Sequence, residues 1–116
     1  MDNCLFCKIA RGDIPANKVF EDDDVLAFRD IQPQRPVHIL VIPKRHITSL
    51  AHVAEADIPL LGKILAVANK IAVDQGSPEG FRTIINTGRI GGQEVAHLHA
   101  HIVGGPDPVG PMLKRI

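Results

Sequence analysis

Apolar residues recur along this chain with two different periods, and the periods predict most of its secondary structure. Over Glu55–Gln75 they keep steps of three and four, which predicts one long amphipathic helix. Short apolar runs rich in β-branched residues predict strands at 19–21, 25–28, 38–43 and 81–86. The run 38–43 is almost continuously apolar, so we expect a central strand that is covered on both faces.

The last apolar segment differs from the others because a histidine occupies every second position. It reads His97-Leu98-His99-Ala100-His101-Ile102-Val103. On a strand, alternate side chains point to one face at intervals of about 6.5–7 Å. We therefore expect a row of three imidazoles backed by packed apolar residues. A Gly-Gly-Pro sequence follows too soon for the segment to be a helix.

The order of these elements predicts an α+β fold. A short N-terminal helix at residues 4–11 precedes a hairpin, the central strand, the long helix and two closing strands. We expect one domain over residues 1–116, in which a mostly antiparallel sheet of about five strands carries the long helix on one face. Asp22–Asp24 has the composition of a solvated hairpin turn and lacks the ligand spacing of a calcium loop.

Composition and charge exclude several classes of protein. The chain has 13 basic and 13 acidic side chains, so no net charge points to a nucleic acid polymer or an anionic membrane. It has no Trp or Tyr, and hence few platforms for stacking bases. No apolar run approaches the roughly 18 residues of a membrane span, and the start shows no signal peptide. We expect a cytoplasmic protein.

The histidine row allows three interpretations. It could be a solvated strand face, a zinc or copper site, or a site for nucleophilic and acid–base chemistry. Gly91-Gly92 lies shortly before the row and exposes backbone N–H groups that could approach an oxyanion closely. Asn86 could add an amide, and His38 begins the central strand. Together these residues favour a phosphate-handling site over a bare metal cage.

Cys4 and Cys7 form a second candidate site. Such a pair can be inert, redox-active or part of a zinc site. A redox pair normally follows a strand in a βαβ unit, which this sequence does not predict, and zinc needs two more ligands. His52 fits neither candidate site, and we expect it to be exposed.

The segment 97–103 resembles the His-φ-His-φ-His-φ-φ signature of the histidine triad (HIT) superfamily, where φ is an apolar residue. The likeness extends over nearly the whole chain and is greatest to the Hint branch, the histidine triad nucleotide-binding proteins. It is carried by Cys7-Lys8-Ile9, Gly12-Asp13-Ile14-Pro15, Ala27-Phe28-Arg29-Asp30-Ile31, Pro33-Gln34, Pro36-Val37-His38-Ile39-Leu40-Val41-Ile42-Pro43-Lys44 and Gly91-Gly92-Gln93-Glu94-Val95. The resemblance implies a HIT-like fold.

The resemblance also implies an activity. Hint-like proteins are homodimers that bind purine nucleoside monophosphates and hydrolyse nucleoside 5′-phosphoramidates. His99 would be the nucleophile that attacks the α-phosphorus, expels the amine and forms a nucleotidyl-histidine, which water then hydrolyses. His101 would contact the phosphate and assist proton transfer to the leaving group, and His38 would complete the catalytic cluster.

The same resemblance implies the nucleotide-binding residues. Asp30 would bind the ribose hydroxyls. The base would lie among Phe6, Ile9, Phe28 and Ile31. The phosphate side would comprise Asn86, Gly92, Gln93, Glu94 and Val95. Glu94 stands where some relatives have a serine that bonds to the phosphate.

Several members of the superfamily hold a structural zinc ion, which implies a metal site at Cys4, Cys7, His46 and His97. The metal would not take part in the chemistry, and His97 would then be structural. Two alternatives stay open beside the phosphoramidate hydrolase. One is a dinucleoside polyphosphate hydrolase of the same superfamily, and the other is a zinc-stabilised nucleotide-binding scaffold whose hydrolysis is incidental.

Overall fold

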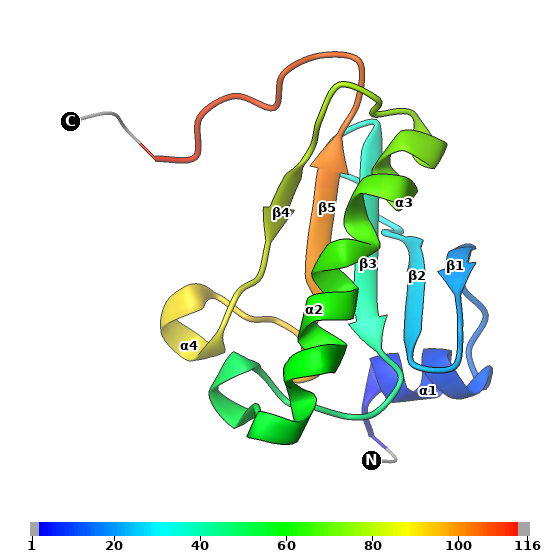
Figure 1. Ribbon diagram of the computed structural model, residues 1–116, viewed down its shortest axis with the longest axis vertical. Helices are drawn as coiled ribbons and strands as arrows, with labels where there is room; N and C mark the ends of the chain where they lie inside the picture. The colour runs from blue at the N-terminus through cyan, green and yellow to red at the C-terminus, as the bar shows by residue number, and fades with distance from the viewer. Residues whose placement is uncertain (1–2, 114–116) are drawn as a thin grey trace.

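Five strands form one antiparallel sheet in the order β1-β2-β3-β5-β4 (Figure 1). The structure is a computed structural model that describes residues 3–113. The strands are β1 (Lys18–Glu21), β2 (Val25–Arg29), β3 (Val37–Pro43), β4 (Arg82–Ile84) and β5 (Ala100–Gly104). The predicted α+β class and the antiparallel sheet are confirmed.

Strand β3 lies at the centre of the sheet, and all seven of its residues are buried. Alternate residues serve different faces because successive side chains on a strand point in opposite directions. Val37, Ile39 and Val41 belong to the apolar core beneath the long helical segment. Leu40 and Ile42 join a second core on the opposite face. His38 also points to that face, so the central strand carries one polar side chain into the second layer.

Helices α2 (Ile58–Ala66) and α3 (Ala68–Gln75) cover the first face as a single column (Figure 1). The prediction of one uninterrupted helix from Glu55 was wrong at its start and at Val67. Two 3₁₀ turns, η1 (Leu50–His52) and η2 (Glu55–Asp57), precede α2.

Local hydrogen bonds explain why the helix begins late. The Asp57 carboxylate accepts the N–H of Ala54 at 2.9 Å, which closes a tight turn, and Pro59 follows in the first helical turn. Val67 separates the two helices with a ψ angle of −10°, yet its carbonyl still accepts the N–H of Ile71 at 3.2 Å. Gly76 ends α3 with a φ angle of 112°, a conformation that favours glycine.

Helix α1 (Leu5–Arg11) packs on the second face. Its buried side chains Phe6 and Ile9 complete a core with Leu26, Phe28, Leu40 and Ile42. The Cys4 sulfur caps the helix by accepting the N–H of Cys7 at 3.3 Å. The cysteine pair of the sequence therefore marks the start of a helix that packs against the sheet.

The histidine strand is shorter than its sequence pattern predicts, because β5 begins at Ala100. His97 and His99 precede it, although Leu98, Ala100 and Ile102 are all buried as alternation requires. Pro43 at the end of β3 has no N–H, and its carbonyl lies 2.8 Å from the ring Nε2 of His97. The His97 side chain thus occupies the Pro43 carbonyl, which would have to accept a backbone N–H if β5 began earlier.

The closing segments also differ in detail from the prediction. Strand β4 is limited to three residues, and the glycine-rich loop that follows contains a short helix, α4 (Gly88–Gly91). Among residues 3–113, no helix is both long and apolar enough to cross a membrane.

Candidate active site and metal centre

His38 and His101 form a chain of hydrogen bonds with a definite direction. The backbone N–H of Gln34 donates to Nδ1 of His38 at 3.0 Å. Nε2 of a neutral His38 must therefore carry the ring proton, and it lies 2.9 Å from Nδ1 of His101. His101 then accepts at Nδ1 and bears its own proton on Nε2. The outer nitrogen of His101 is left as a donor.

His99 is oriented in the opposite sense. Its Nδ1 lies 2.8 Å from the backbone carbonyl of His97, which can only accept, so Nδ1 carries the proton. The other ring nitrogen, Nε2, keeps a free lone pair. The ring is buried and packs against the ring of Phe6 at 5.2 Å between centroids, and against His101 at 5.1 Å. A nucleophilic nitrogen and a proton donor are thus held side by side, an arrangement suited to acyl or phosphoryl transfer.

The surroundings tune this cluster. One carboxylate oxygen of Asp30 accepts the N–H of Gln32 at 2.8 Å, and the other lies 3.4 Å from Nε2 of His38. Burial lowers the pKa of His101 below its usual value, and the nearby His99 and His38 rings lower it further. The lowered pKa favours the neutral form of the His101 ring, as the hydrogen-bond chain requires.

A cavity of about 340 Å³ opens beside these histidines. It brings together nine residues singled out from the sequence, namely Phe6, Asp30, His38, Asn86, Gly92, Glu94, Val95, His99 and His101. Sequence reasoning missed Gln32, Gln34 and Leu40, which also line it. Gln34 contributes through its backbone N–H, and no side-chain pattern announces such a contact.

Four of the residues expected to bind the nucleotide do not line this cavity. Ile9 and Phe28 are buried behind it in the second core, and Ile31 is 94% exposed. The side chain of Gln93 is turned into the protein, where its amide nitrogen donates to the carbonyls of Thr48 and Val95 at 2.7 and 2.9 Å. Gln93 therefore supports the loop that forms one wall of the cavity.

Cys4, Cys7, His46 and His97 meet at the end of the sheet next to α1. Their potential ligand atoms all lie within 4.8 Å of one another. Nδ1 of His97 lies 3.3 and 3.4 Å from the sulfurs of Cys4 and Cys7, and Nδ1 of His46 lies 3.3 Å from that of Cys7. A tetrahedral zinc ion separates such ligand atoms by about 3.3–3.8 Å. These four residues are close enough to hold a metal ion.

The outer nitrogens of the two histidines are anchored as metal-ligating imidazoles usually are. Nε2 of His97 donates to the carbonyl of Pro43 at 2.8 Å, and Nε2 of His46 lies 3.2 Å from the Thr48 hydroxyl. Burial lowers the pKa of His97 to about 4, so the ring is neutral and able to coordinate near pH 7. Burial also raises the pKa of the Cys7 thiol, an effect that a bound divalent cation would reverse.

Comparison with known proteins identifies the family. A family model described as "Scavenger mRNA decapping enzyme C-term binding" matches residues 3–115. The chain is 55% identical to Protein HitA of Neisseria gonorrhoeae over 106 residues. The aligned part covers 91% of this chain and 99% of the relative. It is 49% identical over 115 residues to the purine nucleoside phosphoramidase of Escherichia coli K12, covering 98% and 96%.

Solved structures agree with this relationship. A HIT family hydrolase from Legionella pneumophila is 53% identical, with a TM-score of 0.86 and coverage of 90% of this chain and 95% of that one. A HIT family hydrolase from Clostridium thermocellum is 43% identical, with a TM-score of 0.91 and coverage of 97% and 99%. The chain therefore belongs to the family that this model describes, which is part of the histidine triad (HIT) superfamily.

Proposed function

We propose that this protein is a nucleotide-binding hydrolase that cleaves the P–N bond of purine nucleoside 5′-phosphoramidates. The observation that carries the proposal is the opposed orientation of His99 and His101, a free lone pair beside a proton donor. Support comes from the 49% identity to a protein named purine nucleoside phosphoramidase, over nearly the full length of both chains.

The reaction would proceed in two steps. Nε2 of His99 attacks the α-phosphorus, a new P–N bond forms, and the bond to the amine breaks. His101 supplies a proton from Nε2 to the departing nitrogen while His38 holds its Nδ1, and the water that attacks in the second step returns a proton to His101. Water then attacks the nucleotidyl-histidine and releases the nucleoside monophosphate. Because one P–N bond replaces another, the intermediate lies near the substrate in energy.

The cavity beside the histidines would hold the nucleoside monophosphate. Asp30 would accept hydrogen bonds from the two ribose hydroxyls, which suits a carboxylate. Phe6 would pack against the base, with Ile9 and Phe28 supporting it from the core and Ile31 at the rim. Asn86 and the loop Gly92–Val95 would border the phosphate.

The test is an assay with adenosine 5′-phosphoramidate, in which release of AMP is followed by chromatography. We expect turnover, and in samples denatured at alkaline pH, where a P–N bond to histidine survives, we expect a protein mass increased by one adenylyl group on the peptide that contains His99. Absence of AMP release by folded wild-type protein would overturn the proposal. Turnover without adduct on that peptide would overturn the covalent step.

We also propose that the cysteine–histidine cluster (Cys4, Cys7, His46 and His97) holds a structural zinc ion. Such an ion supplies no chemistry to the reaction but fastens the start of α1 to the segment before β5. Thiolate ligands in a reduced state are consistent with a cytoplasmic protein, which we keep as part of the proposal. Elemental analysis of the purified protein tests the metal directly.

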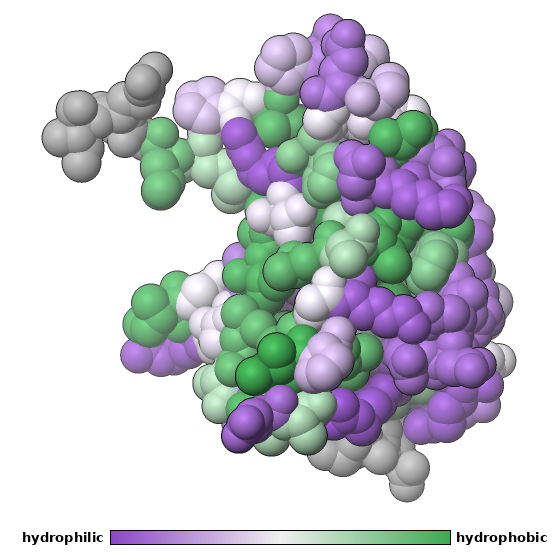
Figure 2. All heavy atoms as spheres, in the orientation of Figure 1, coloured by the Kyte–Doolittle hydropathy of each residue, from purple (hydrophilic) through white to green (hydrophobic). Residues whose placement is uncertain are grey.

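A homodimer completes the proposed function. Apolar side chains gather over α2 and towards the edge strand β4 in Figure 2, whereas hydrophilic ones cover the side of β1 and β2. Leu65 is 54% exposed and borders an apolar cavity of about 160 Å³ that reaches His99. A second copy packed against this surface would remove its exposed apolar side chains from water. Sedimentation at micromolar concentration should show a dimer, and Leu65→Glu should weaken it.

A further inference from the structure

A second cavity, of about 340 Å³, lies next to the one that would hold the nucleotide. The two cavities share Gln34, His38, Asn86 and His101. They meet at the histidines, where the phosphorus atom of a substrate would be placed. If the nucleoside monophosphate fills the first cavity, a group attached to phosphorus on the far side of His101 enters the second.

The second cavity is lined by positively charged side chains and by two histidines. Arg35 and Arg82 contribute guanidinium groups, and its lining contains no Asp or Glu. Within residues 3–113, neither arginine forms an ion pair with a carboxylate. The cavity therefore has an unneutralised positive charge on the side away from the nucleotide.

The sheet register places Arg82 on the catalytic face. Arg82 pairs with Val103, and Val103 pairs in turn with His38. Residues that are directly paired project to the same face, so these three form one row across the sheet. The next row contains Ile84 and His101. Arg82 and His38 are thus two strands apart, about 10 Å at a strand spacing of about 4.8 Å.

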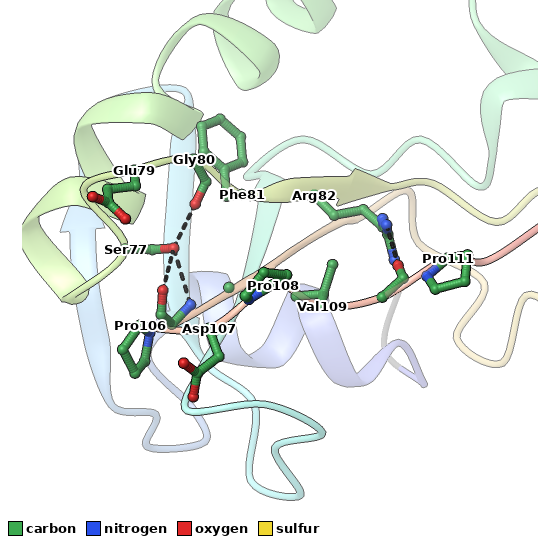
Figure 3. Close-up of a pocket in the computed structure, with 13 residues that line it drawn as sticks. Ser77, Glu79, Gly80, Phe81, Arg82, Pro106, Asp107, Pro108, Val109 and Pro111 are labelled. Atoms are coloured by element: carbon green, nitrogen blue, oxygen red, sulfur yellow. Dashed lines mark hydrogen bonds between the residues drawn. The ribbon is translucent and has the colours of Figure 1, made fainter.

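Both guanidinium groups bond to the chain after β5. Arg35 donates to the carbonyls of Gln34 and Val109 at 2.7 and 3.2 Å. Arg82 donates to the carbonyl of Gly110 (Figure 3). These partners are uncharged peptide groups, which occupy some N–H donors but leave the positive charges in place.

A larger cavity of about 670 Å³ on the other side of this tail has a different character. Glu79 and Asp107 line it together with Ser77 (Figure 3). The buried Ser77 hydroxyl donates to the carbonyl of Gly80 and accepts the N–H of Gly105. It contains no histidine. This cavity shares Arg82, Val109 and Pro111 with the second cavity but is lined by none of the reacting groups.

We propose that the second cavity binds the leaving group of the substrate, and that Arg35 and Arg82 select leaving groups that carry a negative charge. This inference rests on the proposed function. The shared chemistry is an anionic group, either the carboxylate of an amino acid or the phosphate of a nucleotide. The bond that breaks joins phosphorus to the leaving atom, which takes the proton from His101, while the anionic group stays bound to the guanidinium groups until it departs.

The test compares two adenosine phosphoramidates that differ in one functional group. Their leaving amines are β-alanine and β-alanine amide, which have the same length but carry a carboxylate or a neutral carboxamide. We expect wild-type protein to prefer the carboxylate in kcat/KM relative to the Arg35→Gln and Arg82→Gln variants. Each replacement should lower the carboxylate-to-carboxamide ratio about two- to fivefold, the size expected for a partly exposed charge pair.

Arg11→Gln is the matched control, because Arg11 pairs with Asp13 on the surface and lines neither cavity. Its ratio should equal that of the wild type. If both substrates slow equally in the Arg35 and Arg82 variants, the arginines only hold the tail and the inference is wrong. If neither substrate releases AMP, the proposed function itself fails and the inference with it.

A third substrate, diadenosine tetraphosphate, separates the two sources of anionic group. Hydrolysis that depends on Arg35 and Arg82 for this substrate alone would assign the cavity to a nucleotide leaving group. Dependence in the β-alanine pair would assign it to carboxylate-bearing amines. Arginine dependence in neither case overturns the proposal.

Discussion

The two groups of histidines in this protein use the same ring in opposite orientations. In the cysteine–histidine cluster, His46 and His97 turn Nδ1 towards the sulfurs and anchor Nε2 on the protein. In the active-site cluster (His38, His99 and His101), Nδ1 is the anchored nitrogen of both His38 and His99. The nitrogen left over, Nε2, faces a neighbouring ring or the cavity.

Backbone partners, more than residue types, therefore decide which ring nitrogen of each histidine is free to react or to bind a metal. A carbonyl partner forces a proton onto the anchored nitrogen and frees the other one, whereas an N–H partner does the reverse. His97 connects the two clusters, since its ring faces the cysteines while its carbonyl orients His99. The two clusters can be separated by substitutions that address one function each.

The largest expected effect is on activity. His99→Ala removes the proposed nucleophile and should lower kcat/KM for adenosine 5′-phosphoramidate by at least about 10³-fold, as loss of a covalent catalyst does. Metal content should stay close to that of the wild type, because the His99 ring lies outside the cysteine–histidine cluster. Loss of a buried ring that packs against Phe6 should lower the melting temperature by a few degrees, far too little to unfold the protein in the assay. A matched His52→Ala variant, altered at an exposed ring outside both clusters, should keep full activity.

The next effect is on stability. Cys7→Ser removes a ligand of the cysteine–histidine cluster and should lower the free energy of unfolding by about 3–4 kcal/mol, the contribution of a metal present at 100- to 1,000-fold its dissociation constant. Thermal melts with and without a chelator measure this. Wild-type protein should be destabilised by the chelator, and the variant should be insensitive to it. A chelator-insensitive wild type with little bound zinc would contradict the metal assignment.

A smaller effect is expected at the inner member of the hydrogen-bond chain. His38→Ala should lower kcat about 10- to 100-fold, part of the range that general acid–base catalysis supplies. His38→Gln should recover some of this loss, since its amide can accept from Gln34 and donate to His101. The loss should grow as the leaving amine becomes more basic, which a series of phosphoramidates would show. An equal loss for every amine would contradict a part for His38 in the proton transfer from His101 to the leaving group.

The smallest effect concerns pH. Burial lowers the pKa of His101 in the folded state, so the unfolded chain binds its proton at a higher pH than the folded protein does. The contribution of this ring to stability is complete above the unfolded pKa and is lost as the pH falls through the folded one. Melting temperatures between pH 7 and pH 5 should therefore fall less steeply for His101→Asn than for the wild type. Parallel curves would contradict this origin.

Periodicity predicted the elements that depend on local pattern. The apolar run at 38–43 is the central strand, and the acidic turn Asp22–Asp24 joins two strands, where Asp22 accepts the N–H groups of Asp24 and Val25. Periodicity mispredicted the start of a strand where a residue distant in sequence forms a competing hydrogen bond. The start of β5 at Ala100 follows from a bond between the His97 ring and Pro43, which are 54 residues apart in sequence.

Residue type and local spacing were enough to predict the family, the antiparallel α+β class and the residues that can carry chemistry. Only the tertiary structure decided which nitrogen of each histidine is free, because the deciding partners are backbone groups of Gln34, Pro43 and His97. It alone also placed Arg35 and Arg82 in one cavity. The two are far apart in the chain, and no local pattern records that the folded sheet brings them together beside His101.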